Sequence, residues 1–273
     1  MADVFAGTTA LLAGTVRIEG RIMPASNATF FGSVMVRESE ASGLRCVYKP
    51  VAGERPLWDF PDGSLAGREV AAYLVSEALG WDVVPPTVLR DGPAGMGMVQ
   101  AWREPDPEQD PVDLVLGADA AEGTPRGYLH VLDAFDEADR PVSLVHEDSA
   151  PLRRMAVFDV LVNNADRKGG HVLPMVGGHR YGVDHGVCFH VENKLRTVLW
   201  GWAAQPLDPS DLPALEQLAE GLATATSPMR AALAVHLAAD EIRALTSRAA
   251  GLLGRRRMPL PGRGWPSIPW PAF

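Results

Sequence analysis

The sequence predicts an α+β fold in which a strand-rich N-terminal part precedes a mostly helical C-terminal part. Three observations indicate this arrangement. Short runs that alternate apolar and polar residues fill the early chain, the composition turns acidic and proline-rich after Trp102, and longer stretches with helical spacing follow. With 273 residues, the chain is long enough to bury a substantial core, as one large domain or as two smaller units.

Two alternating segments near the N-terminus predict a β-hairpin. Residues 14–23 and 29–37 have the strand pattern, and residues 24–28 between them (Pro-Ala-Ser-Asn-Ala) have turn chemistry. A third strand is expected over residues 44–49. Pro50 should end it, because proline has no backbone N–H to donate to a ladder.

One helix and two more strands are expected next. Ser64 is a good N-cap, residues 65–79 place small and apolar side chains at helical spacing, and Gly80 is a typical C-terminal stop. The further strands are predicted over residues 87–90 and 96–101. Together these elements predict a small β-rich unit with one helix.

The chain changes character after this unit, and we expect one unit over residues 1–102 and another over residues 103–273. The acidic, proline-rich segment just after the boundary is typical of a linker. Helices are predicted over residues 151–163, 212–223 and 229–253. The Pro- and Trp-rich C-terminal end is expected to pack as an irregular tail.

Composition excludes several classes of function. A net charge of −9 argues against a general nucleic-acid binder, which needs a basic face, and against binding to an anionic membrane surface. No apolar stretch is long enough for a transmembrane helix, and the N-terminus lacks a basic leader, so we expect a cytoplasmic protein without stable membrane insertion. The only cysteines, Cys46 and Cys188, offer neither a disulfide framework nor a zinc site.

Lysine is rare in this sequence, and its positions are informative. The basic residues are almost all arginine, and the only lysines are Lys49, Lys168 and Lys194. Because lysine carries a compact ammonium and arginine a planar fork, a lysine among arginines suggests a site that needs the smaller group. Taken alone, Lys49 at a strand end is equally consistent with a solvated surface charge.

Two acidic motifs follow the first helix of the C-terminal part. Asp166 lies in the run Asn-Asn-Ala-Asp-Arg-Lys-Gly-Gly-His over residues 163–171, and Asp184 opens an Asp-His-Gly turn after an apolar segment. The 18 positions between these aspartates leave room for a short hairpin that brings both carboxylates to one mouth. Two carboxylates there can clamp Mg²⁺ or Mn²⁺ and neutralise a triphosphate. His171 follows Asp166 at the spacing that separates the catalytic Asp from the metal-binding Asn in protein kinases.

These motifs resemble the catalytic and metal-binding segments of the phosphatidylinositol 3-/4-kinase-like superfamily, which includes the HipA-type bacterial kinases. The resemblance rests on Asn-Ala-Asp-Arg at 164–167 and Val-Asp-His-Gly at 183–186. Residues 47–50 and 68–73 resemble the strand with the phosphate-gripping Lys and the helix whose Glu pairs with it. The resemblance spans residues 14–200 and implies a protein-kinase-like two-lobe fold, with a small β-rich N-lobe with one helix and a larger, mostly helical C-lobe. The run Gly-Glu-Arg-Pro-Leu-Trp-Asp-Phe is similar to one in an actinobacterial branch.

The resemblance implies an ATP-dependent phosphotransferase that moves the γ-phosphoryl group to a hydroxyl acceptor, with Mg²⁺ or Mn²⁺ as the metal. The implied residues are Asp166, Arg167 and Lys168 for catalysis; Ser26, Asn27, Thr29, Lys49, Glu69, Gln100 and Trp102 for the nucleotide; and His171 and Asp184 for the metal. Backbone groups of residues 100–102 would meet the adenine edge. His171 replaces the Asn of the family, and imidazole suits softer ions than Mg²⁺.

The acceptor is expected to be a protein Ser/Thr or a soluble metabolite in preference to a lipid. Lipid kinases need a basic surface for an anionic headgroup, whereas this chain is acidic overall. Autophosphorylation at Ser26 or Thr29 is a further expectation.

Two other functions stay open at this stage. One is a nucleotide-binding module without catalysis, marked by the change at His171. The other is a metal-dependent hydrolase that uses Asp166, His171, Asp184 and His185 as a carboxylate–imidazole cluster. The hydrolase hypothesis leaves Lys49 without a role. Asp159, on the helix before the motif, is interpreted as a buried hydrogen-bonding residue.

Overall fold

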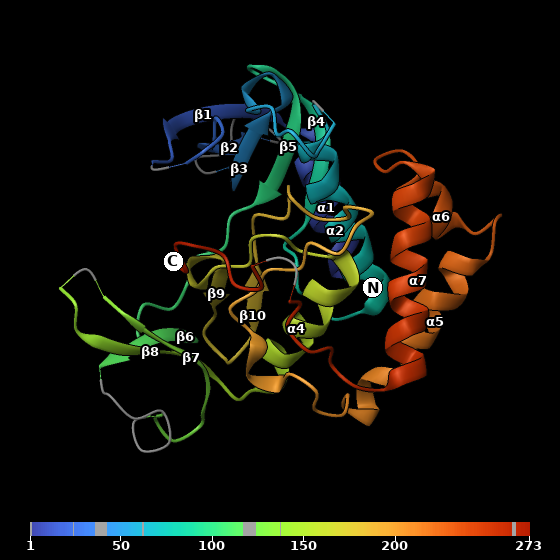
Figure 1. The fold of residues 1–273 in the computed structure, drawn as a ribbon. Coiled ribbons are helices and arrows are strands. Elements are labelled where there is room, and N and C mark those ends of the chain that lie inside the picture. Colours follow the sequence, from blue (N-terminus) through green and yellow to red (C-terminus); the bar gives the residue numbers. More distant parts are fainter. Residues whose placement is uncertain are drawn as a thin grey trace.

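The structure is a computed structural model (Figure 1). It describes residues 2–23, 25–35, 43–61, 63–116, 124–136, 138–263 and 266–273. Pro24 of the predicted turn and the end of the predicted strand at 29–37 lie outside these ranges. Among the described helices, none combines the length and the apolar character needed to cross a bilayer.

An antiparallel sheet forms the N-terminal part, as the alternating segments predict. Its strands are β1 (Thr15–Arg21), β2 (Phe30–Met35), β3 (Leu44–Pro50), β4 (Thr87–Gly92) and β5 (Gly95–Ala101), in the order β1-β2-β3-β5-β4. The predicted hairpin is confirmed by the pairing of β1 with β2. Pro50 is the last residue of β3, opposite Gly97, so proline ends this strand from within it.

Two helices accompany this sheet, where the sequence predicted one. The additional helix is α1 (Ala2–Ala13), whose Leu11 is buried in a small apolar cluster with residues of the sheet. Its sequence, ADVFAGTTALLA, contains Gly and two Thr and no polar stripe, so neither helix propensity nor periodicity announces it.

Helix α2 (Leu65–Leu79) has the predicted bounds but a different N-terminal cap. Ser64 was the expected cap, yet its side chain accepts no capping bond, and its hydroxyl donates to Pro61 O instead. The carboxylate of Glu54 takes this position, accepting the backbone N–H groups of Leu65 and Ala66 at 3.1 and 2.8 Å. A negative charge at a helix N-terminus is also favoured by the helix dipole.

The C-terminal part is more helical, with one division that the sequence pattern missed. Its helices are α4 (Ala150–Val162), α5 (Leu212–Ala223), α6 (Pro228–Leu233) and α7 (Ala239–Arg255), and its hairpin is β9 (Val172–Pro174) with β10 (Arg180–Gly182). Short 3₁₀ turns cover Val51–Gly53, Gly169–His171, Trp200–Trp202 and Pro209–Asp211. The single helix predicted over 229–253 is two helices, because Glu241 caps a new N-terminus by accepting Ala238 N–H at 2.8 Å.

A second antiparallel sheet, which the sequence analysis did not predict, follows the segment predicted as a linker. Strands β6 (Val112–Leu116), β7 (Tyr128–Phe135) and β8 (Pro141–Glu147) pair in the order β6-β8-β7. Figure 1 shows this sheet as a separate layer beside the hairpin. Central strand β8 is almost entirely buried. The acidic composition masked this pattern, because the charged residues are concentrated in the connections and on the exposed faces.

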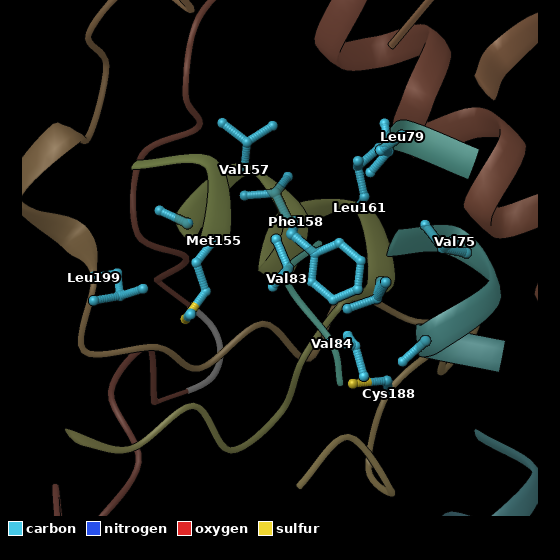
Figure 2. Close-up of a cluster of buried hydrophobic side chains, with 14 of the residues drawn as sticks. Val75, Leu79, Val83, Val84, Met155, Val157, Phe158, Leu161, Cys188 and Leu199 are labelled. Carbon is cyan, nitrogen blue, oxygen red and sulfur yellow. The ribbon is translucent and has the colours of Figure 1, made fainter. Parts of the chain in front are cut away.

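The main apolar core joins α2 to α4 and fixes the start of the site. Figure 2 shows Phe158 and Leu161 of α4 among Val75 and Leu79 of α2, with Cys188 alongside. All five side chains are buried. Because α4 packs against α2, the position of the loop that directly follows α4 is fixed.

Candidate active site

A cavity of about 580 Å³ lies between the N-terminal sheet and the loops of the C-terminal part. Ten of the twelve residues implied by the resemblance line it: Ser26, Asn27, Thr29, Lys49, Gln100, Trp102, Asp166, Lys168, His171 and Asp184. Glu69 lies behind this wall, and Arg167 points into the interior. We call this cavity the cleft.

Lys49 is the centre of the charged groups in the cleft. From β3 its Nζ donates to Glu69 Oε1 at 2.7 Å and to Asp184 Oδ1 at 2.8 Å. Burial alone would lower the pKa of Lys49, but the carboxylates of Asp184 and Glu69 outweigh it and hold that pKa above its ordinary value. The ammonium is therefore charged at neutral pH and sits at the cleft wall.

Glu69 joins α2 to the chain that follows Asp184. Its carboxylate is buried, and its second oxygen, Oε2, accepts the backbone N–H of His185 at 2.8 Å. One side chain therefore fixes both the Lys49 ammonium and the Asp-His-Gly turn. Two other carboxylates of this part of the chain, Glu54 and Glu77, could also have paired with Lys49. Glu54 instead caps α2, and the partner of Lys49 on this helix is Glu69.

Helix α2 is also fastened on its far side. Arg68, the neighbour of Glu69, is fully buried and forms an ion pair with Glu241 of α7. Its guanidinium also donates to Cys188 O at 2.6 Å and lies over the Phe60 ring. These contacts fix the rotation of α2 about its axis and hence the direction of Glu69.

Asp166 is reached through a tight turn after α4. Asn163 ends the helix in the left-handed conformation (φ 54°), which Asn tolerates better than most residues. The side-chain Oδ1 of Asn164 then accepts Asp166 N–H at 2.9 Å. The Asp166 carboxylate is about one-third exposed, between Lys168 Nζ at 3.5 Å and Arg196 Nη2 at 3.9 Å. Arg196 is a neighbour of Asp166 that the motif spacing did not reveal.

Arg167 does not belong with the catalytic group in which the resemblance placed it. It is completely buried, and its Nε and Nη2 donate to the Asp159 carboxylate at 3.0 to 3.1 Å. Its Nη1 donates to the carbonyls of His171 and Val183, both at 3.1 Å. Asp166 lines the cleft, whereas Arg167 points inward and ties the two motif segments together from inside. Asp159 is buried and hydrogen-bonded, as interpreted from the sequence.

His171 faces Asp184 across the cleft. Its Nδ1 donates to Asp166 O at 2.9 Å, which leaves the lone pair on Nε2, 3.5 Å from Asp184 Oδ2. Burial lowers the pKa of His171, so the ring is neutral at neutral pH. The Lys49 ammonium lowers the pKa of Asp184 well below its ordinary value, so this carboxyl is ionised. Asp184 itself has φ 63°, a strained conformation of the kind found at functional sites.

The two facing groups suit a divalent ion whose remaining ligands come from elsewhere. One imidazole and one carboxylate are present, and the described residues contain no group of three or more His, Cys, Asp or Glu placed to hold a metal. Phosphate oxygens and water complete such sites in phosphotransferases. His185, which the hydrolase hypothesis required, is buried, and its Nε2 accepts from Arg167 Nη2 at 2.6 Å. It does not face the cleft.

Two backbone N–H groups of the segment expected to contact adenine, residues 100–102, already donate to other parts of the chain. The backbone N–H groups of Ala101 and Trp102 donate to Pro86 O and Arg45 O, both at 2.9 Å, so neither is available to a base. The cleft wall continues through Arg103, Glu104 and Pro105. Nothing in the types of these three residues predicted that they line the cleft. Gln100 is buried and donates to Thr87 Oγ1.

The turn over the cleft is anchored to the 3₁₀ turn after β3. Asn27 Oδ1 accepts Arg55 N–H at 2.8 Å, and Ala28 N–H donates to Gly53 O at 3.0 Å. Thr29 is buried, and Ser26 is exposed. The C-terminal tail, irregular as predicted, reaches the opposite side of the cleft, where Ala272 O accepts Gly169 N–H at 2.8 Å.

Comparison with solved structures defines the class of fold. The Golgi casein kinase with Mn and ADP bound matches with a TM-score of 0.57 and 15% identity, over 92% of this chain and 75% of that one. Hydra Fam20 with sugar matches with a TM-score of 0.57 and 14% identity, over 93% and 88% of the two chains. The fold is kinase-like. No protein-family model matches the sequence.

A curated relative gives the family. Protein Rv2133c of Mycobacterium tuberculosis is 54% identical over 265 residues, which are 95% of this chain and 93% of that protein. The chain belongs to the Protein Rv2133c family.

Proposed function

We propose that this protein is an ATP-dependent phosphotransferase that moves the γ-phosphoryl group to a hydroxyl acceptor. The observation that carries the proposal is the position of Lys49, which contacts Glu69 and Asp184 at the wall of the cavity that Asp166 also lines. A kinase needs an ammonium for the phosphates, an acidic group for the metal and a second acidic group for the attacking hydroxyl, all at one opening.

In the proposed reaction, the acceptor oxygen attacks the γ-phosphorus while the bond from that phosphorus to the β-phosphate oxygen breaks. Asp166 orients the hydroxyl and receives its proton, and ADP leaves. Lys49 and Lys168 neutralise phosphate charge. A divalent ion, when bound, would be held by His171 and Asp184 and would neutralise the rest. Imidazole as a ligand favours Mn²⁺ over Mg²⁺.

The division of labour follows the proposed units. Residues 1–102 grip the nucleotide through the turn with Ser26, Asn27 and Thr29 and through Lys49. Residues 103–273 carry the catalytic loop, and the backbone of Arg103 and Glu104 meets the adenine edge.

Turnover of ATP by the Asp184→Ala variant tests the assignment. The variant should lose all divalent-dependent turnover, while binding of nucleotide without metal should persist. Asp240→Ala, which removes an exposed carboxylate from α7, is the matched control and should keep full turnover. Unchanged turnover in the Asp184 variant refutes the assignment.

The acceptor is proposed to be a protein Ser/Thr or a soluble metabolite. Ser26 is exposed and lines the cleft, so the chain itself is one candidate. Incubation with ATP and Mn²⁺ followed by intact-mass measurement should add phosphate to the wild type and not to Ser26→Ala. A wild type that gains no mass excludes autophosphorylation.

A nucleotide-binding module without catalysis is the second candidate, and the observation that favours it is His171 in place of the usual Asn. Calorimetry showing ATP binding, combined with no ADP after long incubation with Mn²⁺, would select it over the phosphotransferase. His171→Asn should then raise turnover.

A further inference from the structure

A second cavity, of about 810 Å³, lies in the C-terminal part of the molecule. One wall is the segment 191–195, which follows the Asp-His-Gly turn along the chain. The other walls come from α7 and from the residues between Pro259 and Gly262. We call this cavity the α7 groove. None of the residues lining it belongs to the proposed nucleotide, metal or catalytic groups.

Arg248 of α7 lines the groove and is a largely buried cation that forms no ion pair with a described residue. Its Nε donates to Leu161 O at 2.7 Å and its Nη1 to His190 O at 3.3 Å. Its Nη2 is buried and finds no hydrogen-bond partner in the described parts of the chain. Burial lowers the pKa of this guanidinium to about 10. A buried charge bonded only to carbonyls is costly, and an incoming anion would offset that cost.

Three arginines that are more deeply buried than Arg248 have a different arrangement. Arg68 pairs with Glu241, Arg167 with Asp159, and Arg180 with Glu147. In each pair a buried or partly buried carboxylate accepts hydrogen bonds from the guanidinium. Arg248 forms no such pair with any carboxylate among the residues that the structure describes.

The groove also has a flat apolar surface. Trp58, from the loop before α2, is 86% exposed, although large aromatic side chains are normally buried. Its position is fixed, because Lys194 Nζ lies 4.5 Å from the ring centroid and is itself bonded to Asp59. An exposed indole held in place by a cation is a platform on which a planar ring can stack. The volume suits a ligand of small-molecule size.

We propose that the α7 groove binds a small molecule in which an oxyanion, a phosphate or a carboxylate, is attached to a planar ring. The oxyanion accepts one or two hydrogen bonds from the Arg248 guanidinium, and the ring of the ligand stacks on Trp58. The planar guanidinium suits either oxyanion. Binding here does not depend on phosphotransfer, so this site is separate from the cleft in both place and chemistry.

The groove is mechanically connected to the catalytic loop. Asn163, three residues before Asp166, donates through Nδ2 to His190 O and Glu192 O at 2.8 and 2.6 Å. Its Oδ1 accepts Lys194 N–H at 3.0 Å. His190 O is the same carbonyl that Arg248 contacts. A ligand that moves Arg248 therefore acts on the segment that holds the turn before Asp166.

Calorimetry on the full chain with three probes tests the proposal. Phenyl phosphate carries both features, inorganic phosphate only the oxyanion, and benzyl alcohol only the ring. Phenyl phosphate should bind at least tenfold more tightly than either of the others, and saturating ADP should leave its affinity unchanged. No binding of phenyl phosphate, or its displacement by ADP, overturns the proposal.

Three variants assign the binding to the groove. Arg248→Gln should weaken phenyl phosphate at least tenfold. Trp58→Ala, at an exposed position where folding is not at risk, should reduce phenyl phosphate to the affinity of inorganic phosphate. Arg243→Gln, an exposed arginine of the same helix, is the control and should bind like the wild type. Wild-type affinity in both the Arg248 and Trp58 variants contradicts the proposal.

Discussion

Two charged clusters lie on either side of the Asp166 loop. Both pair a basic side chain with carboxylates, but one is partly exposed in the cleft and the other is buried. In the cleft, Lys49 joins Glu69 and Asp184, and the Asp184 side chain is half exposed. In the interior, Arg167 joins Asp159, and both side chains are fully buried. A pair that must meet a substrate has to keep one member accessible, whereas a pair that holds a loop gains from complete burial and full hydrogen bonding.

Adjacent residues of one motif can therefore have different functions, one in the cleft and one in holding the loop. Asp166 and Arg167 are neighbours in the sequence, yet one opens to the cleft and the other closes the interior. Variants of the cleft cluster should therefore change turnover with little change in stability, and variants of the interior cluster should do the reverse.

Asp166→Asn should produce the largest change. Loss of the proton acceptor should lower kcat by about 10²- to 10⁴-fold, the usual contribution of a general base. The free energy of unfolding should stay within about 0.5 kcal/mol, because this carboxylate is partly exposed and weakly paired. Steady-state kinetics and urea unfolding measure the two quantities. Equal kcat in the variant and the wild type would remove Asp166 from the mechanism.

Arg167→Met should produce the largest loss of stability. It leaves the Asp159 carboxylate buried without its cation, which costs about 3–5 kcal/mol. Urea unfolding followed by circular dichroism measures this loss, with Arg243→Met as an exposed control. A variant as stable as the wild type but inactive would show that Arg167 acts on substrate instead.

Glu69→Gln should have an intermediate effect. The amide oxygen can still accept the His185 N–H, but the charge that helps to fix Lys49 is lost. We expect kcat/KM for ATP to fall about tenfold, or about 1.4 kcal/mol. Glu77→Gln, on the same helix, is the matched control. Similar losses in both variants would mean that α2 is merely destabilised.

The smallest effect concerns pH. His146 accepts Gly201 N–H on Nε2 and donates from Nδ1 to Glu147 O, and burial lowers its pKa. Below pH ~6.5 the unfolded chain binds a proton on this ring that the folded protein does not, so stability falls as pH falls, by at most about 1.4 kcal/mol per pH unit. His146→Gln should reduce the slope of unfolding free energy between pH 5 and 7. An unchanged slope would show that His146 does not contribute to it.

The sequence predicted those helices and strands whose formation depends on short-range patterns of residues. The strands of the N-terminal sheet and the bounds of α2 and α5 follow from alternation, helical spacing and end signals. The β6-β8-β7 sheet was missed because the acidic composition of this part of the chain concealed the apolar–polar alternation of its strands. Helix α1 was missed because its sequence has no polar face. The break before α7 was missed because the capping residue, Glu241, lies within the predicted helix, three residues after Ala238.

Long-range geometry was not predictable in the same way. Motif order correctly gathered Lys49, Asp166 and Asp184 at one cavity, but it could not show that Arg167 turns inward or that Arg196 lies beside Asp166. Those directions depend on Asp159 and on the segment after Asp184, which fold against the loop from other elements. The backbone N–H groups of Ala101 and Trp102 likewise donate to Pro86 O and Arg45 O, and only the fold shows these hydrogen bonds.

A crystal structure with a non-hydrolysable ATP analogue and Mn²⁺ tests the central claim most directly. We expect anomalous scattering from Mn²⁺ next to His171 Nε2 and the Asp184 carboxylate, with the Lys49 ammonium on the phosphates and the γ-phosphate turned towards Asp166. A nucleotide bound outside the cleft, or a metal that touches neither His171 nor Asp184, would contradict it.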